Sequence, residues 1–112
     1  KGECPRIFGD GGQTRDFIYV EDLAKFIVES LEKECCNKLF HLANGKQISI
    51  NYVCELLKKY TGFSGEICYV EGVKGEVRDI VLDIRKVKEE LGWSSQTSIE
   101  EGLKKSVEWF KE

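Results

Sequence analysis

The chain contains 112 residues, 41% of them hydrophobic and 33% charged, and its formal net charge at pH 7 is −3. This length is enough for one domain, residues 1–112, with a modest core. The basic residues are dispersed along a net acidic chain, which argues against nucleic acid as a partner. No apolar run approaches the ~20 residues that span a bilayer, and the amino terminus has no apolar signal-peptide core. We therefore expect a cytoplasmic protein with no membrane partner.

The cysteines are odd in number, and none follows the C-x-x-C spacing of many metal and redox sites. Cys54 falls on an apolar helical stripe and Cys68 in a strand-like run, where cysteine acts as a small hydrophobic residue. We interpret the cysteines as reduced cytosolic thiols; redox activity is an alternative for the adjacent pair. The five are Cys4, Cys35, Cys36, Cys54 and Cys68.

The first expected elements are two strands and a helix. Residues 7–8 and 17–20 are rich in strand formers and flank the glycine-rich turn of residues 9–13, which predicts a hairpin. Asp22 is suited to cap a helix that runs to about Lys33, because the apolar residues that follow it recur at helical spacing.

The next expected elements are a strand and a second helix. Residues 39–43 have the pattern of a short strand closed by the turn Asn44-Gly45. Ser49 is a suitable N-cap for the helix, and Gly62 stands where that helix should end.

The last part of the chain predicts two more strands and two more helices. The strands are residues 66–70 and 77–82, and the helices are residues 84–91, between Asp83 and Gly92, and residues 99–110. Ser98 and Glu101 form the sequence pattern of a capping box at the start of the final helix. The whole pattern predicts an α/β fold with a small mixed sheet, a hairpin and about four helices.

Polar residues that follow the glycine turn are the best candidates for a binding site. The glycines lead into a strand, so they lack the strand-to-helix context of a dinucleotide fingerprint. Gln13 and Arg15 stand at the edge of the turn, and the planar fork of arginine suits the paired oxygens of a diphosphate. From the residues alone, an internal ion pair of Arg15 with Asp16 or Asp10 is the stronger interpretation. Tyr19 shares strand parity with Arg15 and is expected to face the same pocket.

Six segments occur in an order and at spacings that are typical of one protein family. They are RDFIYV at residues 15–20, FHLANG at 40–45 with Ser49 after it, GEVRD at 75–79, LDIRK at 82–86, LGW at 91–93, and IEEGL with VEWF at 99–110. Together they resemble the sugar-nucleotide-binding part of NAD-dependent epimerases and dehydratases, the extended short-chain dehydrogenase/reductase family typified by UDP-glucose 4-epimerase. The resemblance implies that the chain is the C-terminal substrate domain of such an enzyme.

The resemblance also assigns roles to individual residues. It implies that Arg15 contacts the diphosphate of a UDP- or dTDP-sugar, and that Asp16 is a structural brace. Glu76 matches an acidic residue that approaches the nucleotide ribose in some members of the family.

One position departs from the family pattern. The family places a second diphosphate-binding arginine where this chain has Val73, with Lys74 beside it. Either Lys74 or Arg78 supplies the missing charge, or binding depends more heavily on Arg15. Lysine offers a point charge without the bidentate fork, so the replacement is not conservative.

Catalysis in this family needs NAD on a Rossmann domain and a Tyr-x-x-x-Lys pair, and the chain contains neither motif. We therefore assign no catalytic, cofactor-binding or metal-binding residue, and we expect no NAD on this chain and no turnover from it. The sequence lacks methionine, even at position 1, so we expect an N-terminal Rossmann domain to be missing. The face that would contact that domain should be apolar, which predicts self-association into a homo-oligomer. The alternative is a stand-alone, non-catalytic module that binds nucleotide sugars or a protein partner.

Overall fold

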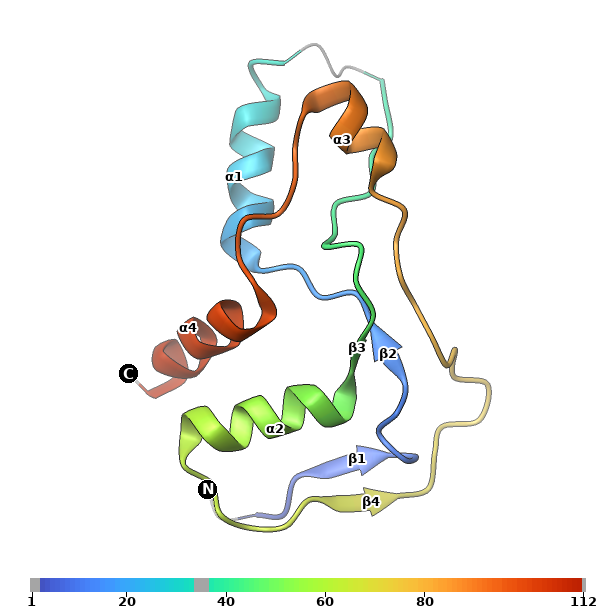
Figure 1. Cartoon of the computed structure of the whole chain (residues 1–112), viewed down its shortest axis with the longest axis vertical. Coiled ribbons are helices and arrows are strands. Elements are labelled where there is room, and N and C mark those ends of the chain that lie inside the picture. The colour runs from blue at the N-terminus through green and yellow to red at the C-terminus, as the bar shows by residue number, and fades with distance from the viewer. Residues whose placement is uncertain (1–2, 34–36, 112) are drawn as a thin grey trace.

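A computed structural model describes residues 3–33 and 37–111 of the chain. The described part contains four helices and four short strands (Figure 1). In chain order they are β1 (Arg6–Phe8), β2 (Thr14–Arg15), α1 (Val20–Ser30), β3 (Ile48–Ser49), α2 (Ile50–Thr61), β4 (Cys68–Val70), α3 (Arg85–Leu91) and α4 (Ile99–Lys111). The expected α/β class with about four helices is confirmed.

The strands form two separate pairs, one parallel and one antiparallel. β1 pairs with β4 in parallel, with Ile7 opposite Tyr69, and β2 pairs with β3 in antiparallel register, with Thr14 opposite Ser49. The predicted hairpin is therefore wrong. The glycine turn does not bring residues 17–20 back onto β1, because the chain after β2 leads into α1 and each strand takes a distant partner.

Local capping signals in the sequence correctly predict both ends of α2, the end of α3 and the start of α4, whereas α1 ends at Ser30 instead of near Lys33. Ser49 caps α2, since its Oγ accepts a hydrogen bond from the Tyr52 amide at 3.1 Å. Gly62 and Gly92 end α2 and α3 in the left-handed conformation, with φ of 71° and 62°. At α4, the Glu101 amide donates to Ser98 Oγ at 3.2 Å, as the capping box predicts.

Three predictions about local structure are wrong. Residues 39–43 and 77–82 do not form strands, although Thr14 makes an isolated parallel bridge with Asp79. α1 begins at Val20, so Asp22 lies inside its first turn instead of capping it. The Asp22 carboxylate accepts bonds from the amides of Gln96 and Thr97, because tertiary contacts use it to tie α1 to the segment before α4.

The core lies between α1 and α3. Phe26, Val87 and Trp93 form its buried centre, and the rings of Phe26 and Trp93 meet edge to face with centroids 5.4 Å apart. Phe40 and Ile84 are among the half-buried residues around it. Packing of this kind fixes the upper half of the molecule in Figure 1, above the strands that carry the candidate site.

A disulfide joins Cys4 to Cys68, which corrects the expectation that these two thiols are reduced. The bond forms because the parallel pairing of β1 with β4 brings the two Cα atoms to 6.1 Å, a distance suited to a disulfide. Cys54 is a free, half-buried thiol. The adjacent pair Cys35 and Cys36 falls outside the described residues.

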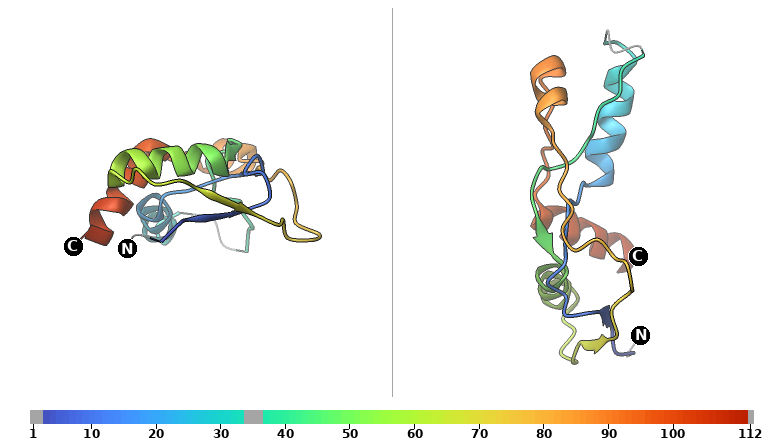
Figure 2. Two further views of the ribbon diagram at one scale, coloured as in Figure 1. Left: turned by 90° about the horizontal axis from the view of Figure 1, so that it is seen from below. Right: turned by 90° about the vertical axis from the view of Figure 1, so that its right-hand side faces the viewer.

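The molecule is a thin layer with principal extents of 49 × 36 × 17 Å (Figure 2). Its radius of gyration is 16.6 Å, whereas a compact domain of this length has about 13 Å. Its accessible surface is 8299 Å², against about 6,300 Å² for a compact monomer of this mass. Large apolar side chains lie on the extra surface, among them Leu31, Leu39, Trp109 and Phe110. No helix in the described ranges is both long and apolar enough to cross a membrane.

Candidate functional site

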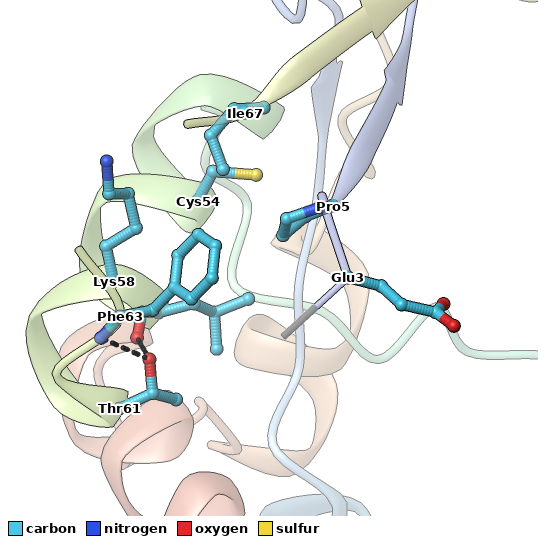
Figure 3. Close-up of a pocket in the computed structure, with 8 residues that line it drawn as sticks. Glu3, Pro5, Cys54, Lys58, Thr61, Phe63 and Ile67 are labelled. Atoms are coloured by element: carbon cyan, nitrogen blue, oxygen red, sulfur yellow. Dashed lines mark hydrogen bonds between the residues drawn. The ribbon is translucent and has the colours of Figure 1, made fainter. Parts of the chain in front are cut away.

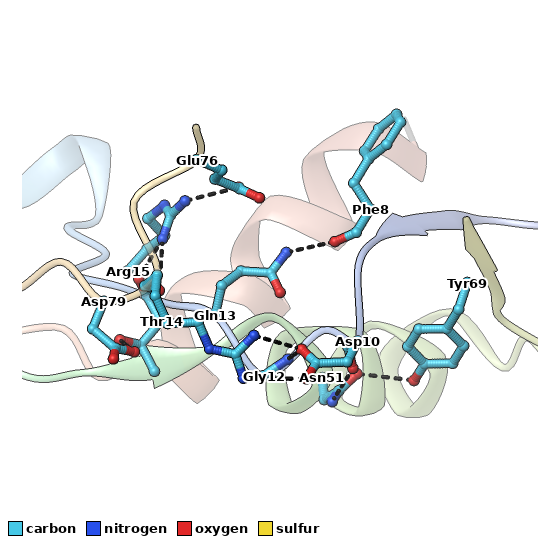
Figure 4. Close-up of polar contacts among 11 residues, drawn as sticks. Phe8, Asp10, Gly12, Gln13, Thr14, Arg15, Asn51, Tyr69, Glu76 and Asp79 are labelled. Carbon is cyan, nitrogen blue, oxygen red and sulfur yellow. Dashed lines mark hydrogen bonds and ion pairs between the residues drawn. The ribbon is translucent and has the colours of Figure 1, made fainter. Parts of the chain in front are cut away.

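The candidate site lies where two loops run side by side after the paired strands (Figure 4). Residues 9–15 follow β1 and residues 71–79 follow β4. The Gly9 amide donates to the Val70 carbonyl at 2.9 Å, and a Cβ built on Gly72 would lie 3.5 Å from the Gly9 Cα. The close approach of the two backbones brings charged side chains from both loops together.

Arg15 reaches from the end of β2 to the second loop. Its Nη2 lies 2.9 Å from Glu76 Oε1, and its Nη1 donates to the carbonyls of Thr14 and Arg78 at 2.7 and 3.3 Å. The internal ion pair expected from the residues alone therefore exists, but with Glu76 instead of Asp16 or Asp10. A quarter of the Arg15 side chain is exposed, so the guanidinium remains open to solvent.

Arg78 forms the second ion pair between the loops. Its Nη1 and Nη2 lie 2.8 and 3.2 Å from the two carboxylate oxygens of Asp10, which also accepts the Gly12 amide at 2.8 Å. The bond to Arg78 lowers the pKa of Asp10, and the same bond raises the pKa of Arg78. Both side chains are well exposed, so the pair is screened by solvent.

Lys74 is exposed, and no ion pair holds it within residues 3–33 and 37–111. Val73 beside it is also exposed, with 58% of its surface accessible. An exposed ammonium group that no acidic side chain of the described residues holds therefore lies next to position 73.

Gln13 and Tyr19 have mainly structural surroundings. Gln13 is buried, and its Nε2 donates to the Phe8 carbonyl at 2.9 Å (Figure 4). The ring of Tyr19 faces α4: a Cβ built on Gly102 would lie 3.4 Å from it, and Lys105 Nζ lies 5.5 Å from its centroid. The structure does not bring Tyr19 to Arg15, because β2 ends at Arg15 and strand parity no longer applies beyond it.

The glycine turn caps α2. The amides of Ile50 and Asn51 donate to the carbonyls of Gln13 and Gly11 at 3.1 and 2.9 Å. Because φ of Gly11 is 73° and a Cβ there would lie 2.1 Å from Asn51 Oδ1, only glycine fits. The first amides of α2 are therefore engaged within the protein, and the turn offers no dinucleotide cradle.

Asn51 is a site residue that the sequence reasoning missed. Its Nδ2 donates to the Asp10 carbonyl at 3.0 Å, and its Oδ1 accepts the Tyr69 hydroxyl at 2.9 Å. It links α2, the glycine turn and β4. No local sequence pattern predicts these long-range hydrogen bonds.

Asp16 connects three distant segments. One carboxylate oxygen accepts the Asn44 amide at 2.9 Å, and the other accepts the amides of Gly45 at 2.9 Å and Leu82 at 3.2 Å. These contacts fit the expected role of a structural brace, and they hold the strand that carries Arg15 against the segment after the second loop.

A separate apolar cavity of about 420 Å³ lies between α2 and the start of β1 (Figure 3). Its wall includes Pro5, Cys54, Leu57, Phe63 and Ile67. No residue predicted for sugar-nucleotide binding lines it, although Lys58 and Thr61 do.

Comparison with known proteins identifies the family. A family model described as GDP-mannose 4,6 dehydratase matches residues 1–106. The chain belongs to this family. A putative UDP-glucose 4-epimerase of Methanocaldococcus jannaschii is 42% identical over 111 residues, which are 99% of this chain and 35% of that protein. The family resemblance inferred from the six segments is confirmed.

Solved structures of family relatives have the same fold. A Thermotoga maritima UDP-glucose 4-epimerase with UDP-glucose superposes with a TM-score of 0.91 at 42% identity, over 98% of this chain and 35% of that one. A Bacillus cereus UDP-glucuronic acid 4-epimerase in complex with UDP-glucuronic acid and NAD gives 0.85 at 32% identity, over 96% and 35%. The chain thus spans about a third of the length of the relatives it matches.

Proposed function

We propose that this chain is the nucleotide-sugar-binding C-terminal part of an NAD-dependent sugar epimerase or dehydratase, most specifically of the UDP-glucose 4-epimerase type. The observation that carries the proposal is the partly exposed guanidinium of Arg15 at the junction of the two loops. The similarity to an epimerase solved with UDP-glucose supports it. A cytoplasmic location, expected from the sequence, remains part of the proposal.

Binding would exchange the acidic partner of Arg15 for a diphosphate. A guanidinium can hold two oxygens of a diphosphate at once, and charge-assisted bonds of this kind are stronger than neutral ones. Glu76 already occupies one nitrogen of Arg15, so its carboxylate must turn away from the ligand as the diphosphate approaches. In this arrangement Lys74 supplies the second positive charge, because Arg78 is held by Asp10.

The glycine turn does not suit NAD. Its carbonyls accept the first amides of α2, so the N-terminus of this helix is not available to a pyrophosphate. We therefore place NAD and the catalytic residues in a separate N-terminal domain, and we assign only substrate binding to this chain.

The surface of the chain supports contact with such a domain. The excess over a compact monomer is about 2,000 Å², more than one partner loses in a standard interface. This surface includes three exposed apolar residues in the second half of α1 and at its C-cap: Ile27, Val28 and Leu31. The N-terminal domain is the proposed occupant, and a second copy of the chain would compete for the same surface when that domain is absent.

Calorimetric titration of the complete protein with UDP-glucose tests the role of Arg15. Arg15→Ala should weaken binding by about 1.5–3 kcal/mol, the range for a hydrogen-bonded charged group. Arg85→Ala is the matched control, because Arg85 is an exposed arginine whose ion pair is with Asp83 in the adjacent turn. An unchanged dissociation constant for Arg15→Ala would remove Arg15 from the site and reject the proposal.

A further inference from the structure

The disulfide stands at the starting ends of two parallel strands. Cys4 precedes β1 and Cys68 is the first residue of β4, at a sequence separation of 64. The Cys68 amide donates to the Pro5 carbonyl at 2.8 Å, so the strand pairing begins directly beside the bond. The covalent link therefore fixes where β1 and β4 lie relative to each other.

The opposite ends of the same strands lead into the two loops of the candidate site. Directly after β1, the Gly9 amide donates to the carbonyl of Val70, the last residue of β4, and the Thr14 amide donates to the Arg78 carbonyl at 3.0 Å. The ion pairs described above join the same two loops. The loops are thus held by one covalent bond at the base of the strands and by weaker contacts between the loops themselves. Figure 4 shows the contacts between the loops.

The disulfide is accessible to a reagent from solution. Cys4 is exposed, whereas Cys68 is half-buried. Exposed disulfides exchange with thiolates more readily than buried ones. Cys54 lines the cavity beside Pro5 and Ile67, the neighbours of the two bonded cysteines. Burial raises the pKa of the Cys54 thiol, which disfavours the thiolate needed for attack from within the protein.

We propose that the Cys4–Cys68 bond is a reducible clamp that sets the spacing of the two loops and, resting on the proposed function, the affinity for the nucleotide sugar. The reductant is a dithiol, a class of compound that keeps thiols reduced in the cytoplasm. Reduction frees the starting ends of β1 and β4, so that hydrogen bonds and partly exposed ion pairs hold the loops together without the covalent link. The bridged form presents Arg15 and Lys74 at a fixed separation, and the reduced form does not.

The exchange proceeds in two balanced steps. One thiolate of the dithiol attacks the sulfur of Cys4, the disulfide breaks, and Cys68 leaves as a thiolate that takes up a proton. The second thiolate of the reagent attacks the mixed disulfide and releases Cys4, which is protonated in turn. Two electrons and two protons pass to the protein, and the dithiol becomes a disulfide.

Hydrogen exchange tests the clamp without reference to any ligand. The complete protein, isolated without reductant, is compared before and after treatment with dithiothreitol. The amides of Gly9 and Thr14 should exchange faster after reduction, because their acceptors are the carbonyls of Val70, the last residue of β4, and of Arg78 in the second loop. The Cys4→Ser/Cys68→Ser variant should exchange fast in both conditions, and the Cys54→Ser control should behave like the unaltered protein.

Two results of this experiment would overturn the clamp. One is equal exchange of the Gly9 and Thr14 amides before and after reduction. The other is the failure of mass spectrometry to find a peptide that joins Cys4 to Cys68 in the untreated protein.

Titration with UDP-glucose then tests the link to the site. Reduction should weaken binding about 5- to 10-fold, the lower part of the usual range for coupling between sites. Equal affinity in both states would overturn the coupling. Absence of binding in both states would reject the proposed function itself, and the exchange data would then decide by themselves whether the clamp exists.

Discussion

Arg15 Nη2 and Glu76 Oε1 lie 2.9 Å apart, although the two residues are separated by 61 positions in the chain. The pair joins the two loops of the candidate site, and both partners are partly exposed. The diphosphate of a nucleotide sugar would compete with Glu76 for the same guanidinium. The acidic partner therefore holds Arg15 in place and also opposes an anionic ligand.

Replacement of Glu76 by glutamine should tighten binding of UDP-glucose. Removal of one negative charge leaves Arg15 free for the ligand, and an exposed ion pair of this kind corresponds to about a two- to fivefold change in affinity. The gain should shrink as salt is added, because salt screens exposed charges. Calorimetry at two ionic strengths measures both effects. Weaker binding by Glu76→Gln would mean instead that this carboxylate contacts the ligand directly.

Lys74 and Arg78 should contribute unequally to the site. Lys74 is the cation without an ion pair in the described part of the second loop, whereas Arg78 is held by Asp10. We expect Lys74→Ala to weaken UDP-glucose binding by up to about fivefold and Arg78→Ala to have a smaller effect. A larger loss for Arg78→Ala, measured in the same titrations, would assign the second charge to Arg78.

Gly11→Ala should destabilise the fold by more than Gly75→Ala. Both glycines have positive φ, 73° and 83°, so both replacements introduce similar backbone strain. A Cβ at Gly11 would also collide with Asn51 Oδ1, whereas nothing lies within 4 Å of a Cβ at Gly75. We expect the free energy of unfolding in urea to fall by about 1–3 kcal/mol more for Gly11→Ala, the range for overpacking. Equal losses would show that Asn51 moves aside without cost.

Asp16→Ala should destabilise the chain by about 2–4 kcal/mol, because three backbone amides lose a charged acceptor. Asp79→Ala serves as the control, since its carboxylate accepts a bond from the exposed Thr14 hydroxyl and should matter less. Urea denaturation of both variants measures the difference. Similar stabilities would show that water replaces the Asp16 carboxylate at these amides.

Stability should fall as the pH is lowered from about 4 toward 2. The bonds from Arg85 lower the pKa of Asp83 from 3.8 to about 2, and Arg78 and Tyr52 lower the pKa values of Asp10 and Glu100. A carboxyl group whose pKa is lower in the folded state stabilises the fold above its unfolded pKa, and this contribution is lost as it becomes protonated. In thermal unfolding experiments, the melting temperature of Asp83→Asn should fall less steeply with decreasing pH over this range. The same slope as the unaltered protein would contradict the role of Asp83.

Local signals account for the parts of the structure that the sequence predicts correctly. Ser49 caps α2, and Gly62 and Gly92 end their helices, because each signal acts on backbone groups within a few residues. The family segments likewise identify the family from short stretches of residues.

Long-range contacts decided the rest. The sequence does not specify that β1 pairs with β4 instead of β2, that Arg15 meets Glu76, or that Cys4 meets Cys68. These choices depend on which distant segments pack together. A strand of two or three residues is too short for its sequence pattern to predict which strand it pairs with. The sequence by itself determined the family, both ends of α2, the end of α3 and the start of α4. The tertiary structure decided the strand pairing and the charge partners of the site, because those free energies arise only between segments that folding brings into contact.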